Sequence, residues 1–305
     1  MKLFHLILWM FCGVIHAAEP VTLLFAGSSS TYWNDFPREV ARAIDGKMKG
    51  HVGTRVMPEI VGRSGSDIRV YLEPGFNRYE YGVKSGQTFL DKIRDEKPAF
   101  VVLQIVCRFI MGDDDPAKTG EAHSNAITTY CEAVRAVGSE PVFFEMGWGK
   151  SEREAEGRKR ILDLARRNKI TLFAPCSSAW ARVYAEKPAL ALLHPKDNAH
   201  PGDAGHFLNL ACFYAALTGQ SPVGKLPRTF HVWPHGKYEA DEAKLAAFKP
   251  DPYQAKMPKW MHKHMSMYAT ATLDEETATY LEIVAWETWQ QLSKQLTTKA
   301  ASDHP

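Results

Sequence analysis

Short apolar runs alternate with helix-like segments between residues 21 and 186, and this alternation constrains the fold more than any other feature of the chain. The runs lie at residues 21–26, 52–61, 99–103, 141–146 and 170–174 and have the length and apolar content of buried strands. Strands that alternate with helices are typical of a mainly parallel sheet with helices on both faces. We therefore predict an α/β fold with three layers.

Hydroxyl groups stand at the end of the first apolar run. Gly27, Ser28, Ser29 and Ser30 interrupt the pattern before a helix that we expect over residues 36–44. In open α/β sheets, ligands bind at the carboxyl ends of strands, and amides at the start of the next helix can stabilise negative charge. A serine is well placed here to act as a nucleophile, although an ordinary polar loop would have the same composition.

A second segment, far along the chain, supplies the partners that such a serine needs. Asp197 and His200 lie in Asp-Asn-Ala-His-Pro, just before a helix expected over residues 206–217. A serine nucleophile requires a base to take its proton, and a carboxylate that fixes the imidazole tautomer completes a triad. The spacing allows Asp197 to reach Nδ1 of His200 while Nε2 faces the serine.

These two segments resemble the first and last blocks of the SGNH, or GDSL-type, hydrolases. The family's Gly-(Asp/Asn)-Ser turn corresponds to Gly27–Ser30 and implies that Ser29 is the nucleophile, while its Asp-x-x-His block corresponds to Asp197 and His200. The resemblance extends from about residue 21 to residue 223. It implies a flavodoxin-like parallel sheet, hydrolysis of ester bonds by a Ser-His-Asp mechanism, and no cofactor.

The resemblance also implies an oxyanion hole. The segment 62–67 resembles the family's second block and assigns a donating amide to Gly65, beside the amide of Ser29. The third block, Gly-x-Asn-Asp, is absent, and Gln104 follows the run 99–103 instead. Its side-chain amide either replaces the usual asparagine as an oxyanion donor or only caps the strand end. The family's Asp or Asn before the nucleophile is also replaced, by Ser28.

Aromatic residues near the expected site are candidates for substrate binding. Tyr32 and Trp33 follow the serines, and Trp148 follows the run 141–146, at the same sheet edge as Ser29. An indole in this position either contacts substrate or packs against the core. Aromatic residues in segment 68–86 could likewise wall a sugar or acyl site or only pack the loop: Tyr71, Phe76, Tyr79 and Tyr81.

We expect no metal site. The carboxylates at 113–115 lack the spacing of a calcium loop and are more typical of a solvated loop. Two histidine clusters, His231 with His235 and His262 with His264, lack the cysteine or carboxylate of a zinc spacing.

Composition and the amino-terminal residues limit the class of protein to which the chain can belong. The chain has 305 residues, 45% hydrophobic and 24% charged, as expected for a globular protein. Its net charge of +2 gives no electrostatic case for binding nucleic acid. Residues 1–18 have the pattern of a secretory signal peptide cleaved after Ala17 or Ala18, although a retained anchor stays an alternative. We expect a secreted or periplasmic protein that is not inserted in a membrane after cleavage.

The remaining organisation follows from changes in pattern. We expect a hydrolase-like core over 19–225, an irregular extension packed on it over 226–272, and a helix of the same domain over 273–298. Four cysteines remain after export, and their pairing is open, although Cys131 and Cys212 lie in apolar helical contexts that favour buried thiols: Cys107, Cys131, Cys176 and Cys212.

The substrate class follows only from the resemblance. We expect the chain to remove an acyl group from a small-molecule or glycan ester, with a short-chain ester on a carbohydrate preferred. A lipid or lysophospholipid ester is the enzymatic alternative. The altered first and third blocks leave a further alternative open, a non-catalytic carbohydrate-binding protein on the same scaffold. The sequence leaves the oligomeric state open.

Overall fold

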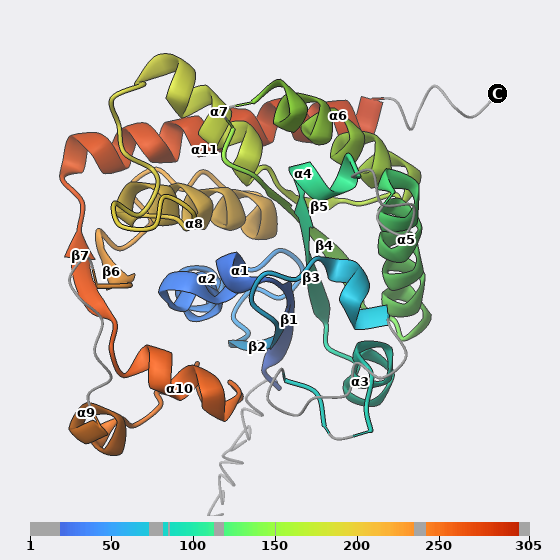
Figure 1. Ribbon diagram of the computed structural model, residues 1–305, viewed down its shortest axis with the longest axis horizontal. Coiled ribbons are helices and arrows are strands. Elements are labelled where there is room, and N and C mark those ends of the chain that lie inside the picture. Colours follow the sequence, from blue (N-terminus) through green and yellow to red (C-terminus); the bar gives the residue numbers. More distant parts are fainter. Residues whose placement is uncertain are drawn as a thin grey trace, which may run out of the picture.

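The computed structural model describes residues 19–72, 82–84, 86–112, 119–149, 151–234 and 242–298. Parallel strands form its central sheet, which has five strands in the order β2-β1-β3-β4-β5 (Figure 1). The strands are β1 Val21–Gly27, β2 Val56–Gly62, β3 Phe100–Val106, β4 Glu140–Met146 and β5 Leu172–Ala174. This order is that of flavodoxin-like sheets, and the predicted α/β fold class is confirmed.

The order of the strands reverses between β1 and β3. Leu23 of β1 pairs with Phe100 of β3, while the other edge of β1 pairs with β2. In open parallel sheets, such a switch point separates the two connecting loops and leaves a crevice at the carboxyl ends of the strands. Ser29 comes two residues after the end of β1, so the predicted nucleophile lies at the switch point.

Helices cover both faces of the sheet (Figure 1). One apolar cluster joins the sheet to helices on the first face: α2 Phe36–Ile44, α7 Cys176–Glu186, α8 Asp203–Thr218 and α11 Glu275–Thr298. A second cluster lies on the opposite face, with η2 Ile68–Leu72, α3 Phe89–Glu96, α4 Cys107–Ile110, α5 Gly120–Ala136 and α6 Glu152–Arg167. Helix α8 is almost completely buried, which agrees with its near-continuous apolar sequence.

Two strand boundaries differ from the sequence prediction. β2 begins at Val56, because residues 52–55 form a turn in which Val52 is 78% exposed. β3 continues through Gln104 to Val106, so Gln104 is a buried strand residue and does not follow the strand. A glutamine is tolerated there because the amide oxygen of its side chain accepts hydrogen bonds from Ser28.

Residues 226–272 are more regular than expected. They contain β6 Thr229–Val232, α9 Glu242–Ala247, α10 Lys259–Met265 and β7 Ala269–Thr272, and β6 pairs with β7 in an antiparallel sheet. Phe230, Met257 and Met261 are buried in the same cluster as α8. Helix α11 also packs there, through Leu281, Val284 and Ala285.

The structure shows whether the four cysteines are paired, a question that the sequence left open. Cys107, Cys131, Cys176 and Cys212 are all buried and free, so the expectation of buried thiols at Cys131 and Cys212 is confirmed. Within the described residues, no helix is both long and apolar enough to cross a membrane.

Candidate active site

The structure brings Ser29, His200 and Asp197 into one hydrogen-bonded chain. Nε2 of His200 lies 2.8 Å from Oγ of Ser29, and Nδ1 of the same ring lies 2.8 Å from Oδ2 of Asp197. Ser29 and the ring of His200 are partly exposed, and the Asp197 side chain is 34% exposed. A partly exposed serine is therefore already in contact with a base.

Local backbone structure holds His200 in place. An antiparallel bridge joins Leu193 to Pro201, and the amide of His194 donates to the carbonyl of His200 at 2.8 Å. Asn198 adopts a left-handed conformation, with φ of 49°, inside the loop that these contacts close. The Asp-x-x-His spacing thus folds into a braced turn just before α8.

Asp197 serves both the turn and the imidazole. Its Oδ1 accepts from the amides of Ala199 and His200, at 2.8 and 3.1 Å, while Oδ2 contacts the ring. Partial burial opposes its charge, but the hydrogen bonds from Ala199 and His200 outweigh burial and hold the pKa of Asp197 below its ordinary value. An ionised Asp197 keeps the proton on Nδ1 and leaves Nε2 free to accept from Ser29.

The turn that carries Ser29 is packed closely against β3. Oε1 of Gln104 accepts from the amide of Ser28 at 2.7 Å and from its hydroxyl at 2.9 Å. A Cβ atom at Gly27 would lie 2.2 Å from Oγ1 of Thr31 and 2.6 Å from Cβ of Gln104. Only glycine fits before the serines, because two side chains occupy the space where any other residue would place its own.

Gln104 does not cap the strand end, because β3 continues past it to Val106. Because Oε1 accepts from the amide of Ser28, the orientation of the amide group is fixed and Nε2 remains as its donor. This nitrogen is buried and has no hydrogen-bond partner among the described residues. Gln104 therefore ties β3 to the nucleophile turn and holds one unused donor near Ser28.

Gly65 lies in the loop after β2, the strand beside β1. Its φ is 69°, in the left-handed region that favours glycine, and the residue is exposed. Tyr71 stabilises the start of this loop: its hydroxyl donates to the carbonyl of Gly27 at 2.7 Å and accepts from the amide of Arg63 at 3.1 Å. Tyr71 is fully buried, so it packs the loop and does not wall a site. Phe76, Tyr79 and Tyr81 lie outside the described residues.

An aromatic stack supports the imidazole. The Trp33 indole lies on the ring of His200, with centroids 3.9 Å apart and planes 10° apart, and Trp233 stacks on Trp33 at 4.8 Å. Trp33, suggested by the sequence as a substrate contact, thus covers a face of the catalytic candidate itself. Trp233 comes from the segment after β6, and no local sequence signal pairs it with Trp33.

The other two aromatic candidates have different neighbours. Tyr32 is partly buried beside Gly62, at the end of β2, and its carbonyl accepts from the hydroxyl of Tyr268 at 3.2 Å. Trp148 follows β4 as predicted and packs against Trp180, with ring centroids 5.2 Å apart. Tyr32 thus packs beside the end of β2, three residues after Ser29, and Trp148 is partly buried against the core.

Two residues with positive φ connect the nucleophile turn to its surroundings. Asn34 and Asp35 have φ values of 59° and 54°, and both are buried. Nδ2 of Asn34 donates to the carbonyl of Pro201 at 3.1 Å, and its Oδ1 accepts from the amide of Trp233 at 2.6 Å. Asn34 thereby links the turn of Ser29 to the loop of His200. Sequence reasoning missed this residue because both of its partners are distant in sequence.

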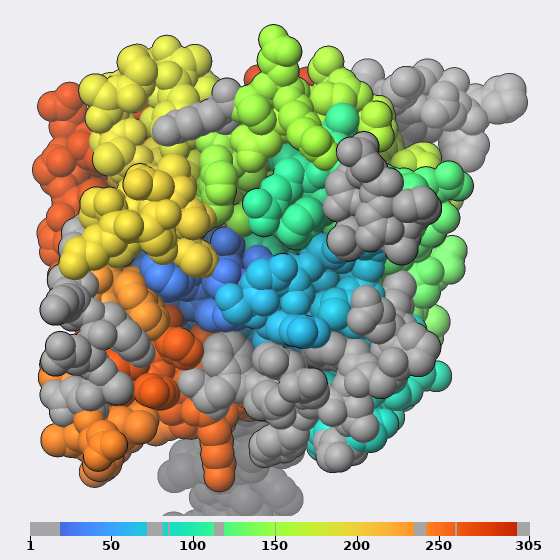
Figure 2. Space-filling view, in the orientation of Figure 1, coloured from blue at the N-terminus to red at the C-terminus, as the bar shows by residue number. Residues whose placement is uncertain are grey.

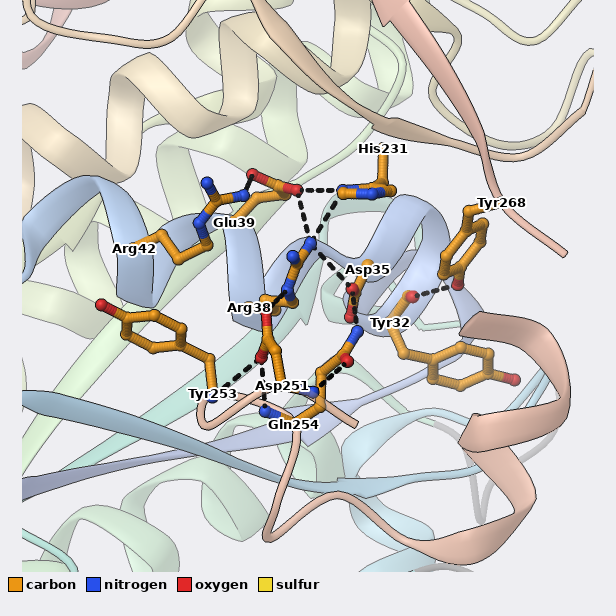
Figure 3. A network of polar contacts seen from close by, with 10 residues as sticks. All are labelled: Tyr32, Asp35, Arg38, Glu39, Arg42, His231, Asp251, Tyr253, Gln254 and Tyr268. Carbon is orange, nitrogen blue, oxygen red and sulfur yellow. Dashed lines mark hydrogen bonds and ion pairs between the residues drawn. The ribbon is translucent and has the colours of Figure 1, made fainter. Parts of the chain in front are cut away.

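A network of polar side chains continues from Asp35 (Figure 3). Arg38 contacts Asp35 at 3.4 Å, Glu39 at 3.1 Å and Asp251 at 2.6 Å. Complete burial raises the pKa of Asp35 to about 7, against the opposing effect of the Arg38 guanidinium. His231 contacts Glu39 at 2.8 Å, so this histidine belongs to the network.

The network includes carboxylates and a histidine but has no metal-ligand geometry. Among the described residues, no group of three or more His, Cys, Asp or Glu side chains could hold a metal ion. The carboxylates at 113–115 and His235 lie outside those residues.

Comparison with known proteins gives only distant likeness. No protein-family model matches the chain, and no curated protein matches it. Among solved structures, the YxiM protein of Bacillus subtilis is similar at 16% identity and a TM-score of 0.46, over 66% of this chain and 57% of that one. A structure of TesA is similar at 14% identity and a TM-score of 0.42, over 65% of this chain and 98% of that one.

A third solved structure is described as a gut microbial diltiazem-metabolizing enzyme. It is similar at 15% identity and a TM-score of 0.40, over 66% of this chain and 47% of that one. This chain therefore spans little more than half of the Bacillus subtilis protein and less than half of the third. Likeness at this level carries no functional argument, so the function has to be inferred from the site itself.

Proposed function

We propose that the chain is a serine ester hydrolase of SGNH type. The observation that carries this proposal is the chain of contacts from Oγ of Ser29 through the ring of His200 to Asp197, with 2.8 Å at each step. A hydroxyl, an imidazole and a carboxylate in this order are the parts that activate a serine nucleophile.

The reaction would proceed in two halves. His200 takes the proton of Ser29 through Nε2 as the serine oxygen attacks the ester carbonyl, and then returns that proton to the departing alcohol. Water next attacks the acyl group on Ser29, with His200 again as base, and the acid is released. Asp197 stabilises the imidazolium that forms in each half.

The oxyanion of each tetrahedral intermediate needs donors that are fixed in advance. We assign this role to the amides of Ser29 and Gly65 and to Nε2 of Gln104. Support for Gln104 comes from its fixed orientation, because Ser28 occupies the acceptor and leaves the donor without a partner among the described residues. Support for Gly65 comes from its place in the loop after β2, next to β1 in the sheet.

The preferred substrate is a short-chain ester on a carbohydrate. The cavity beside Gly65 has arginines in its wall, Arg69, Arg108 and Arg153, which favours a polar substrate over a long acyl chain. The pattern of residues 1–18 supports export, where polymeric carbohydrates would be met. Tyr32 would contact the substrate beside the nucleophile. Trp33, which is partly exposed, would do so beyond the face that stacks on His200 and orients it.

The proposal is tested with the mature protein on two panels, acetylated oligosaccharides and aryl esters of increasing acyl length. We expect activity on short acyl esters, and Ser29→Ala should lower kcat by at least about 10³-fold, since a triad acts as a unit. Ser30→Ala, at the adjacent buried hydroxyl, is the matched control and should retain activity. Binding of oligosaccharides without hydrolysis of any ester would instead support the non-catalytic alternative.

A further inference from the structure

A cavity of about 550 Å³ opens beside the loop of Gly65 and has a strongly basic wall. The residues that line it are Gly65, Asp67, Arg69, Arg108, Phe109, Gly112 and Arg153. Gly65 and Asp67 lie in the loop after β2 and Arg69 lies in η2. Arg108 and Phe109 belong to α4, Gly112 follows α4, and Arg153 is in the first turn of α6. Among the described residues, three guanidinium groups and a single carboxylate thus line this cavity.

The charges of this cavity are not balanced within the described residues. Asp67 neutralises Arg69, through an ion pair at 2.7 Å. Arg108 lies over the ring of Phe109, 4.7 Å from its centroid, and no described carboxylate is within ion-pair distance of it. Arg153 donates to the carbonyl of Gly112, which satisfies a hydrogen bond but not its charge. Counting only the side chains that the structure describes, two positive charges in the wall therefore have no opposite charge beside them.

The cavity shares one residue, Gly65, with the proposed catalytic centre. Gly65 belongs to its wall and is also one of the assigned oxyanion donors. Arg108 follows the carboxyl end of β3, the strand whose Gln104 contacts Ser28. The segments that carry Ser29, Gly65 and Arg108 lie together on one face of the molecule, in blue, cyan and green (Figure 2). An ester bound with its carbonyl at Gly65 has the rest of its structure close to these arginines.

We propose that the substrate carries an oxyanion group, a carboxylate, sulfate or phosphate, which Arg108 and Arg153 bind while the ester carbonyl lies at Ser29. Guanidinium groups present paired donors that match the oxygens of such groups. This inference rests on the proposed function and adds to it the class of substrate, an O-acyl ester of an acidic sugar or similar molecule.

The test compares pairs of substrates that differ only in charge. An acetylated methyl glucuronide and an acetylated methyl glucoside have the same ester and differ in a carboxylate; sulfated and phosphorylated acetyl glucosides identify the preferred anion. We expect kcat/KM to be about 10- to 100-fold higher for at least one charged ester, the range expected for charge-assisted hydrogen bonds. Raising the salt concentration should reduce this ratio.

Substitutions then show which arginines cause the preference for charged esters. Arg108→Gln and Arg153→Gln should each lower the ratio of charged to neutral kcat/KM toward one, and Arg108→Lys should give an intermediate ratio because it keeps the charge but not the paired donors. Arg167→Gln is the matched control, an exposed arginine at the other end of α6, and should leave the ratio unchanged.

Two results would overturn the inference while leaving ester hydrolysis intact: equal kcat/KM for charged and neutral esters in the unsubstituted protein, or a preference that survives both arginine substitutions. Absence of hydrolysis on every ester would contradict the proposed function instead. Because each ratio is measured within one protein, a loss of folded material cannot imitate either result.

Discussion

The indole of Trp33 lies flat against the imidazole of His200, with ring centroids 3.9 Å apart and planes 10° apart. The stack restricts rotation of the ring about its Cβ–Cγ bond, while Asp197 holds one edge by a 2.8 Å contact. A base that is fixed in this way keeps Nε2 directed at Ser29 without reorganisation.

Truncation of this indole should slow the reaction. In Trp33→Ala we expect kcat to fall about 10- to 100-fold, because small misplacements of a catalytic group are costly. Trp33→Phe should retain most of the activity, since it keeps an aromatic face on the ring. Trp286→Ala, which removes a stacked tryptophan from α11, is the control for loss of an indole. Equal kcat in Trp33→Ala and the unsubstituted protein would show that the stack does not position His200.

Asn34 should contribute to both stability and catalysis, because its side chain donates to the carbonyl of Pro201 and accepts from the amide of Trp233. Asn34→Gly keeps the positive φ accessible but removes both bonds, so we expect a loss of about 1 to 3 kcal/mol in the free energy of unfolding and a lower kcat. Asn34→Ala should lose more stability, because it adds the strain of a left-handed alanine. Denaturant unfolding and steady-state kinetics measure both effects, and a Gly variant less stable than the Ala variant would contradict this account.

Gln104 can be tested by separating its acceptor from its donor. Gln104→Glu keeps the oxygen that accepts from Ser28 and removes Nε2, so we expect kcat to fall about 10²- to 10³-fold if that nitrogen stabilises the oxyanion. Gln104→Met removes both functions and should also loosen the turn of Ser29, which would appear as a lower melting temperature. Unchanged kcat in Gln104→Glu, with the variant folded, would assign Gln104 to structure alone.

The sequence and the structure agree best where the pattern is local. The apolar runs predict the strands, and the three-residue spacing of Asp197 and His200 predicts a turn that closes on itself. The predicted strand stops at residue 103 because Gln104 is polar, whereas β3 continues to Val106. The fold shows why this is possible: Ser28 donates a hydrogen bond to the side-chain oxygen of Gln104.

The contacts that complete the site could not be predicted in this way. Trp33 meets Trp233, and Arg38 meets Asp251, across about 200 residues of sequence. No spacing rule relates such pairs, because their proximity depends on how residues 226–272 fold back along the core. The same holds for the convergence of Arg108 and Arg153 on one cavity.

Asp35 should give the protein a characteristic dependence of stability on pH. Burial raises the pKa of Asp35 from 3.8 to about 7 in the folded chain, so the folded state binds a proton that the unfolded state releases at lower pH. The free energy of unfolding should therefore fall as pH rises from about 4 to about 7, by an amount on the order of a few kcal/mol. At higher pH, the contribution of the Asp35 proton to the free energy of unfolding is lost completely.

Asp35→Asn cannot ionise and should lack this component. The melting temperature of the variant minus that of the unsubstituted protein should become more positive from pH 5 to pH 8. Asp163→Asn, at a side chain that is 62% exposed on α6, should show no such trend. A difference that is constant with pH for Asp35→Asn would mean that this carboxyl is ionised throughout.

The most direct test of the central claim is covalent labelling of the mature protein by a fluorophosphonate, followed by mass spectrometry of the labelled peptide. We predict stoichiometric labelling at Ser29, its loss in Ser29→Ala, and its persistence in Ser28→Ala and Ser30→Ala. An unlabelled protein that is nevertheless folded, or a label on a different serine, would contradict the assignment of Ser29 as the activated nucleophile.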